Sequence, residues 1–266
     1  MKKVIYTALT GNYDKLEQPL VIDPSFDYVC LSDKDGRDGV WDIRRIPQDE
    51  PDPVLRSRYP KMHPHLLLPE YDLSVYMDAN LCITSAAFYE AVDKWAEDPY
   101  SAVPFGPDDA LMIPFAVVQH PDRDCVWDEL RRCYLKDKVS TSSAIRWHRY
   151  LKETGMPRHA GLVEANVLVR LHNTQSVIQL DEKWWELLLK SGGRRDQLSF
   201  TPSAHTQNVK FSLLLGPGMN ARNTDCIRCV QHPPTGKENI PGKINLANAK
   251  YNISLLWRKF ILLFLK

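Results

Sequence analysis

LSVYMDAN, residues 73–80, is a short apolar run that ends in an aspartate and an asparagine two positions apart. Its length and composition predict a buried strand over residues 73–77, with Asp78 and Asn80 directly beyond its carboxyl end. Open α/β sheets bind ligands at that edge, and side chains at i and i+2 of an extended segment point the same way. Two oxygen-bearing side chains on one side suit a hard divalent cation such as Mg²⁺ or Mn²⁺, which in turn can hold a diphosphate. The alternative is a strand-ending turn in which Asp78 and Asn80 hydrogen-bond only to the backbone.

Outward from this strand, short apolar runs alternate with longer amphipathic stretches, a pattern typical of an α/β domain. The predicted strands cover residues 4–9, 27–32, 41–46, 73–77, 81–84 and 162–171. The predicted helices cover residues 86–96, 125–135, 142–153 and 182–190, and a further helix begins within 195–200. Residues 51–69 are punctuated by prolines and are assigned to neither class. We expect one domain over residues 1–215 and a basic, turn-rich extension over residues 216–266.

The amino-acid composition and the net charge exclude several classes of protein. The 266 residues are 44% hydrophobic and 25% charged, which excludes a disordered or low-complexity chain. With 34 Lys+Arg against 33 Asp+Glu, the net charge of +1 argues against a protein built around nucleic-acid phosphates. Six cysteines are too few for a disulfide-stapled secreted domain, and the first apolar run is too short for a signal peptide. These observations predict a reduced, cytoplasmic protein without a nucleic-acid partner.

Basic residues gather at the end of the chain. Residues 220–266 hold eight basic and two acidic side chains, a formal charge of +6, which leaves −5 for the rest of a chain whose total is +1. Within them, YNISLLWRKFILLFLK (251–266) places apolar residues at helical spacing on one face and is too short to span a bilayer. We expect an interfacial helix that holds the protein on an anionic membrane surface, at the inner face of the cytoplasmic membrane. The alternative is a terminal helix packed on the domain's own core.

Two further motifs follow the central strand in the order of a known superfamily. GLVEANVLVR (161–170) is a strand-like run with isolated polar residues, and RRDQLS (194–199) follows a helix that carries Trp184 and Trp185. This order resembles glycosyltransferases of the GT-A fold, especially the group of glycogenin and the bacterial lipopolysaccharide galactosyltransferases. In those proteins an Asp-x-Asp strand is followed by a sugar-pocket strand of the type Asn-x-Gly-x-Leu, a tryptophan-containing helix, and Asp-Gln before an apolar helix.

A closer resemblance is to a glycosyltransferase-like family formerly called domain of unknown function 616, found in plants and bacteria. Six segments carry it: VIYTALTGNYD (4–14), DYVCLSD (27–33), SRYPKMHPH (57–65), YMDAN (76–80), HPDRDCVWDE (120–129) and RRDQLSF (194–200). Each is a weak signal alone, but together, in this order over roughly three-quarters of the chain, they are specific. The chain departs from the superfamily pattern at Asn80, which replaces the second acidic residue of Asp-x-Asp. It departs again at Glu164-Ala165-Asn166, which stands where the better-known group has Asn-Ala-Gly.

The resemblance implies a GT-A-type mixed sheet flanked by helices and a metal-dependent nucleotide-sugar transferase. Asp78 and Asn80 would hold the metal, Mn²⁺ or Mg²⁺. A late histidine would join them, for which His232 is the candidate and His205 the rival. The run CIRCVQH (226–232) is only half of a zinc pattern, so His232 has its better use at this metal.

The donor implied by the resemblance is a sugar on a nucleoside diphosphate, most often uridine diphosphate. Thr10 and Asn12, in the loop after the first strand, would border the nucleotide. Asp33 would meet the base or the ribose, or else be a turn aspartate. Arg58 and Lys61 are three residues apart, so on a helical turn they would share a face and could reach the diphosphate. The alternative for this pair is a solvated face.

Four further residues are candidates for substrate binding. His120 and Arg123 would line the donor or acceptor cleft, although polar residues at the start of a helix are usually caps. Glu164 and Asn166 would contact the sugar.

Asp196 and Gln197 are the catalytic candidates, because in a retaining transferase nearby carboxylates and amides stabilise the oxocarbenium-like transition state. Asp196 could equally cap the helix that follows it. The implied reaction transfers a hexose, with retention, to a surface glycan such as a capsule or lipopolysaccharide precursor, free or lipid-linked. The competing functions are a metal-dependent lipid amide hydrolase of the ceramidase type, an activity attached to relatives of this family, and a glycan-binding module without turnover.

Overall fold

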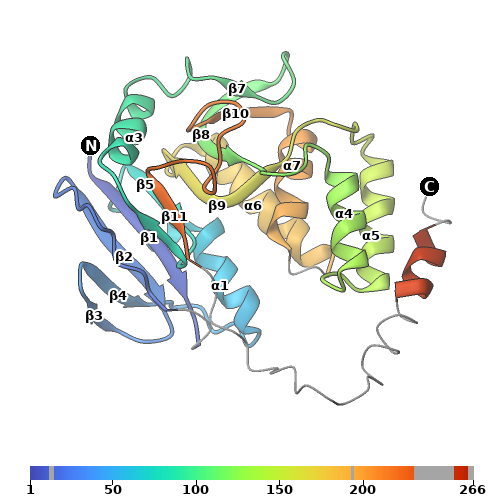
Figure 1. The fold of residues 1–266 in the computed structure, drawn as a ribbon, viewed down its shortest axis with the longest axis horizontal. Helices are drawn as coiled ribbons and strands as arrows, with labels where there is room; N and C mark the ends of the chain where they lie inside the picture. The colour runs from blue at the N-terminus through green and yellow to red at the C-terminus, as the bar shows by residue number, and fades with distance from the viewer. Residues whose placement is uncertain (12–14, 193–194, 231–254, 263–266) are drawn as a thin grey trace.

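The computed structural model describes residues 1–11, 15–192, 195–230 and 255–262 (Figure 1). Nine strands of this part of the chain form one mixed sheet in the order β3-β4-β2-β1-β5-β9-β8-β10-β7, and β6 pairs with β11 in a separate ribbon. The strands are β1 (Lys3–Leu9), β2 (Phe26–Ser32), β3 (Gly36–Asp38), β4 (Trp41–Arg45), β5 (Leu73–Met77), β6 (Leu81–Ile83), β7 (Pro104–Phe105), β8 (Leu111–Gln119), β9 (Val163–Arg170), β10 (Val209–Leu213) and β11 (Ile227–Cys229). The helices are α1 (Pro53–Met62), α2 (Pro64–Leu67), α3 (Ala87–Glu97), α4 (Val126–Leu135), α5 (Thr141–Glu153), α6 (Gln175–Lys190) and α7 (Asp196–Thr206), and residues 255–262 are also helical.

The strand LSVYM lies in the middle of the sheet. β5 is buried at every position and runs parallel to β1 on one side and antiparallel to β9 on the other. A strand covered on both faces is expected to be apolar nearly throughout, as this one is. Since β1 and β5 are parallel, their carboxyl ends meet at one edge, and the first residues of β9 reach the same edge from the opposite direction. There the amide of Asp78 donates to the carbonyl of Asn166 at 3.0 Å.

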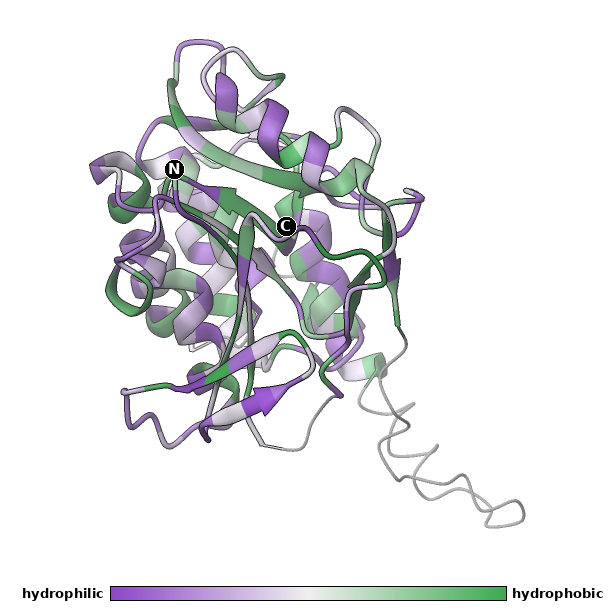
Figure 2. Cartoon of the chain, turned by 90° about the vertical axis from the view of Figure 1, so that its left-hand side faces the viewer, coloured by the Kyte–Doolittle hydropathy of each residue, from purple (hydrophilic) through white to green (hydrophobic). Residues whose placement is uncertain are grey.

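The sheet separates two apolar cores. Tyr6 faces one side, where it belongs to the same cluster as Trp184 of α6 and Phe200 of α7. Ile5 faces the other side and clusters with Phe88 of α3, because successive side chains of a strand point to opposite faces. Figure 2 shows hydrophobic residues along the central strands and a mixture of hydrophobic and hydrophilic positions along the helices. The central strands are therefore covered by packed side chains on both faces of the sheet.

α1 occupies part of the proline-punctuated segment that was assigned to neither class. Asp52 caps it by accepting a hydrogen bond from the amide of Val54 (2.9 Å), and Pro53 takes the first helical turn, where a missing amide costs little. Pro60 lies inside the helix near its end, and its carbonyl accepts a hydrogen bond from the Tyr6 hydroxyl at 3.2 Å. This contact fastens α1 to β1 next to the edge described above.

The predicted α/β class, with a mixed sheet flanked by helices, is confirmed. The helix expected at 182–190 begins earlier, at Gln175. β8 and β10 have no counterpart among the predicted elements. β8 contains Pro114, a residue that argues against a central strand when only the sequence is read.

Residues 216–230, the first part of the predicted extension, pack on the domain. Ala221 is fully buried, and β11 pairs antiparallel with β6 so that Ile227 lies opposite Ile83. This pairing brings the chain back to the residues that follow β5.

The helix at 255–262 lies beside α4 and α5 (Figure 1). Ile261 and Leu262 pack against the apolar cluster of those helices, and Arg258 donates to the carbonyl of Tyr134 at 2.8 Å. Its outer side presents three large apolar side chains that are at least half exposed: Leu256, Trp257 and Phe260. Within the described ranges, no helix has the length and apolar character needed to cross a membrane.

Candidate functional site

A cleft of about 720 Å³ opens where the edges of β1, β5 and β9 meet. Predicted residues from five segments line it: Thr10 after β1, Arg58 and Lys61 on α1, Asp78 and Asn80 after β5, Glu164 and Asn166 on β9, and Asp196 and Gln197 on α7. Residues that are far apart in the sequence thus share one cavity at the carboxyl edge of β5, where α/β folds bind their ligands.

Lys61 is the centre of the charged network in this cleft. Its ammonium nitrogen lies 2.5 Å from Asp196 Oδ2 and 3.6 Å from Asp78 Oδ1, and its side chain is 2% exposed. Arg58, one turn earlier on α1, lies with Nε 3.6 Å from Asp196 Oδ1, so the two basic residues do share a face. A buried ammonium is costly unless it is paired. The two carboxylates therefore permit Lys61 to be buried, and the solvated alternative does not apply to it.

Asp196 is a buried carboxylate held by cations. Burial alone would raise its pKa, but the charges of Arg58 and Lys61 and the hydrogen bond from Lys61 outweigh burial and hold the pKa well below its usual range. The N-cap of α7 is Arg195, and the side chain of Asp196 turns to Lys61, so Asp196 is not the helix cap. The indole of Trp184 donates to the Asp196 carbonyl at 2.9 Å. The tryptophan of α6 thus fixes the start of α7.

Asp78 and Asn80 present two oxygen donors to the cleft. The Tyr76 hydroxyl donates to Asp78 Oδ1 at 2.9 Å, and the side-chain nitrogen of Asn80 donates to the Val230 carbonyl at 3.0 Å. The second bond uses the nitrogen end of the amide, so the oxygen end of Asn80 is the one that can bind a cation. Mg²⁺ is commonly bound through one or two carboxylates together with substrate phosphates and water. One carboxylate and one amide fit such a cation when a diphosphate completes its coordination.

The histidine expected at this metal stays a prediction. His232 lies outside the described residues. The described chain reaches Val230, whose amide donates to the Asn80 carbonyl at 2.8 Å. His205, the rival, lies near the end of α7 with Nε2 3.3 Å from the Thr154 carbonyl oxygen, and it does not line the cleft.

Glu164 and Asn166 enter the cleft from the first half of β9. Glu164 forms an ion pair with Arg222; burial raises the pKa of Glu164, and the hydrogen bond and charge of Arg222 oppose that rise. The side-chain oxygen of Asn166 is buried and accepts no hydrogen bond from the described residues. A buried acceptor without a donor is costly. This oxygen is therefore suited to accept a hydrogen bond from a ligand hydroxyl.

The residues predicted to border the nucleotide fall in different places. Thr10 lines the cleft and donates to the Pro53 carbonyl at 3.1 Å. Asn12 lies outside the described residues. Asp33 does not line the cleft; it accepts a hydrogen bond from the Gly11 amide at 2.9 Å, which is the main cause of its lowered pKa. Asp33 therefore holds the loop after β1 in place.

His120 and Arg123 do not line the cleft. His120 Nδ1 accepts hydrogen bonds from the amides of Asp122 and Arg123, both at 3.1 Å, and the Arg123 guanidinium binds Glu129 at 2.5 Å. These contacts join the turn before α4 to the first turn of that helix. They correspond to the cap-like role that the sequence left open for His120 and Arg123. Neither side chain reaches this cavity, and a contact of either with the substrate stays a prediction.

Three basic residues that line the cleft are absent from the sequence candidates: Lys138, Arg195 and Arg222. Arg195 adjoins the RRDQLS motif and Arg222 belongs to the basic end of the chain, so the sequence holds a weak signal for both. Together with the two basic residues of α1, these three bring the number of cationic side chains that line the cleft to five, among the residues that the structure describes. Three carboxylates line the same cleft. This excess favours a polyanionic ligand.

No protein-family model matches the chain, and a search of curated proteins gives no match. A solved structure described as the bifunctional glycosyltransferase WbbM in its apo form is similar over 77% of this chain, with 10% sequence identity and a TM-score of 0.38. This chain spans 37% of that structure's chain. A likeness of this size defines neither the fold nor the activity of the present protein.

Proposed function

We propose that the protein is a metal-dependent glycosyltransferase that takes a hexose from a uridine diphosphate sugar. The observation that carries the proposal is the composition of the cleft. Five cationic side chains line the cleft that also holds Asp78 and Asn80, at the edge of the sheet where α/β folds bind their ligands. Such a set suits a nucleoside diphosphate with its divalent cation.

The diphosphate would bind between α1 and the residues after β5. Mn²⁺ or Mg²⁺ held by Asp78 and Asn80 would neutralise the charge of the leaving diphosphate. Lys61 is buried and engaged by Asp196, whereas the Arg58 side chain is 25% exposed on the same helix face. Arg58 is therefore better placed to reach a phosphate oxygen, and Lys61 to orient Asp196.

Asp196 would lie beside the reacting sugar. Its low pKa keeps the carboxylate negative, so that it can stabilise positive charge that develops on the sugar ring. Gln197 is next to it, and the Asn166 oxygen would accept a hydrogen bond from a sugar hydroxyl. The same low pKa makes Asp196 a poor general base for activating water, which disfavours the amide hydrolase. Retention of stereochemistry follows from the family resemblance.

The acceptor that we propose is a surface-glycan precursor of the capsule or lipopolysaccharide type, carried on a lipid. The helix at 255–262 supports this acceptor, because Trp257 and Phe260 are exposed beside Lys259. Exposed apolar side chains on a basic helix partition into the boundary between headgroups and acyl chains of an anionic membrane. The enzyme would then work as a peripheral protein at the inner face of the cytoplasmic membrane.

Melting curves with nucleotides, followed by turnover assays, test the proposal. A ligand at a hundred times its Kd stabilises a protein by about 2.7 kcal/mol, so uridine diphosphate with Mn²⁺ should raise Tm more than other nucleoside diphosphates do. Uridine diphosphate should also be released from a uridine diphosphate hexose. Cleavage of ceramide without a nucleotide shift would favour the hydrolase, and a shift with oligosaccharides alone would favour a glycan-binding module.

A further inference from the structure

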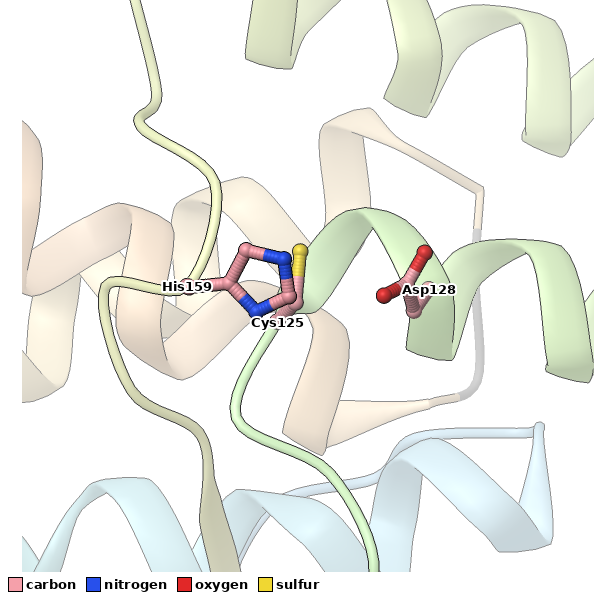
Figure 3. A group of neighbouring side chains, drawn as sticks. All are labelled: Cys125, Asp128 and His159. Carbon is pink, nitrogen blue, oxygen red and sulfur yellow. The ribbon is translucent and has the colours of Figure 1, made fainter.

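Outside the cleft, three side chains of types that commonly bind metals meet at the start of α4 (Figure 3). Cys125 precedes the helix, Asp128 lies in its first turn, and His159 comes from the loop between α5 and β9. Their ligand atoms all lie within 4.8 Å of one another. In the part of the chain that the structure describes, no other group of three histidine, cysteine or carboxylate side chains meets this condition.

Asp124 fixes the orientation of the His159 ring. Its Oδ1 lies 2.9 Å from His159 Nδ1, and when that nitrogen donates its hydrogen, Nε2 carries the lone pair that can bind a metal. Figure 3 shows the ring turned toward the Cys125 sulfur. His159 also has φ 56°, a left-handed conformation that is uncommon for residues other than glycine. The loop backbone is thus shaped to bring this imidazole to the start of α4.

The sulfur of Cys125 has no role in capping the helix. Cys125 is the N-cap residue and is fully buried, but its side chain makes no capping hydrogen bond. The positive end of the helix dipole favours a thiolate and a carboxylate at this place. Cys125 and Asp128 therefore offer two anionic ligands on one side of the imidazole.

We propose that Cys125, Asp128 and His159 bind Zn²⁺. A thiolate, an imidazole and a carboxylate are ligands that zinc takes in proteins, with water or another group at the fourth position. The sulfur and nitrogen donors disfavour Mg²⁺ and Ca²⁺, which prefer oxygen ligands. On binding, Zn²⁺ replaces the thiol proton of Cys125, which is released to solvent.

The ion would tie the loop between α5 and β9 to α4. Protein contacts already join them: the Trp127 indole donates to the Met156 carbonyl at 3.0 Å, and the Arg158 guanidinium lies over the Trp127 ring, 5.3 Å from its centroid. The loop leads directly into β9, which carries Glu164 and Asn166 to the cleft. The zinc site is separate from the nucleotide chemistry proposed above, because none of its three ligands lines the cleft.

Titration of the full chain, stripped of metal by a chelator, with Co²⁺ and then Zn²⁺ tests the site. Because a thiolate ligand gives sulfur-to-cobalt charge-transfer absorption, we expect such a band to saturate at one ion per chain and to disappear when Zn²⁺ displaces Co²⁺. Cys125→Ser and His159→Gln should abolish the band. Asp124→Asn, at a positioning residue, should weaken Co²⁺ binding roughly tenfold to a hundredfold.

Cys229→Ser is the matched control, because Cys229 belongs to the separate CIRCVQH run. It should leave the band intact. A band that persists in Cys125→Ser and vanishes in Cys229→Ser would overturn the proposal, as would the absence of any charge-transfer band in the unsubstituted chain. Asp128 is exposed, so Asp128→Asn should leave folding unchanged and weaken Co²⁺ binding; full Co²⁺ affinity in that variant would overturn the three-ligand site.

Discussion

Lys61 and Asp196 come from α1 and α7, and their contact at 2.5 Å joins two elements across the cleft. Both side chains are nearly buried, so neither charge can be left alone without a large desolvation cost. At the scale of single residues, this ion pair is the most deeply buried of those in the cleft, and it holds the candidate catalytic carboxylate in place.

Lys61→Met should destabilise the protein by about 3–5 kcal/mol, because it removes the hydrogen-bonding partner of a buried carboxylate and leaves Asp196 with the charges of Arg58 and Arg195. Urea unfolding measures the change. The double variant Lys61→Met/Asp196→Leu should recover much of the loss, since no buried carboxylate remains unpaired. A single variant within about 0.5 kcal/mol of the unsubstituted protein would contradict the assigned role of the pair.

Asp196→Asn keeps the shape of the side chain and removes its charge. We expect turnover of a uridine diphosphate hexose to fall on the order of a hundredfold, because the stabilisation of the developing positive charge is lost. The affinity for uridine diphosphate with Mn²⁺ should change far less, since the residue is placed at the sugar. Equal losses of turnover and nucleotide affinity in this variant would place Asp196 at the phosphates instead.

A helix or strand of this protein could be predicted from the sequence when its apolar residues follow a regular spacing. β5 was predictable because it is buried over its whole length, and α3 because one side of the helix is buried over its whole length. α1 was not, because Pro53 and Pro60 obscure a helix whose first proline is in fact compatible with a helix start. β8 was missed because Pro114 interrupts its run of apolar residues.

The turn between β9 and α6 holds a buried histidine, which predicts a stability that depends on pH. His172 is fully buried there, and its Nε2 lies 3.0 Å from the Leu68 carbonyl oxygen. Burial, with a smaller effect of the Arg170 charge, lowers the pKa of His172 to about 4. The folded state thus binds fewer protons than the unfolded state, whose histidine pKa is about 6.5. The contribution of His172 to stability should be retained above that value and be lost, by about 3 kcal/mol, as the pH drops toward 4.

Urea unfolding between pH 7 and pH 4 measures this dependence. Burial also lowers the pKa values of His63, His65 and His120, so His172→Asn should reduce the slope without removing it. An unchanged slope in the variant would show that His172 is not a source of the acid sensitivity.

The helix at 255–262 has an inner side and an outer side that can be tested separately. We expect the intact protein to co-float with anionic liposomes, and the double variant Trp257→Ser/Phe260→Ser to lose this binding without a change in Tm, because both side chains face solvent. Ile261→Ser, on the inner side, should instead lower Tm. Truncation after Lys250 should leave a soluble protein that no longer floats. Truncation also removes the inner side, so it should lower Tm about as far as Ile261→Ser does; aggregation or a much larger loss of Tm would assign the helix to the core.

At the scale of the whole molecule, the sheet assembles the cleft from residues that the sequence separates. The pair Asp78 and Asn80 was predictable because a strand end and an i, i+2 spacing are local features. The pairing of Lys61 with Asp196 and of Arg222 with Glu164 was not, since it depends on which segments cross the same edge. For His120 the sequence left open a place in the substrate cleft or a cap-like role, and in the structure its Nδ1 accepts hydrogen bonds within the turn before α4.

We expect this cleft to bind a nucleoside diphosphate together with a divalent cation held by Asp78. Calorimetric titration of uridine diphosphate into the protein, with Mn²⁺ and again with a chelator, tests it most directly. We expect binding with Mn²⁺ that weakens at least tenfold, about 1.4 kcal/mol, both with the chelator and in Asp78→Asn. Equal affinity under all three conditions, or no binding in the presence of Mn²⁺, would contradict the account.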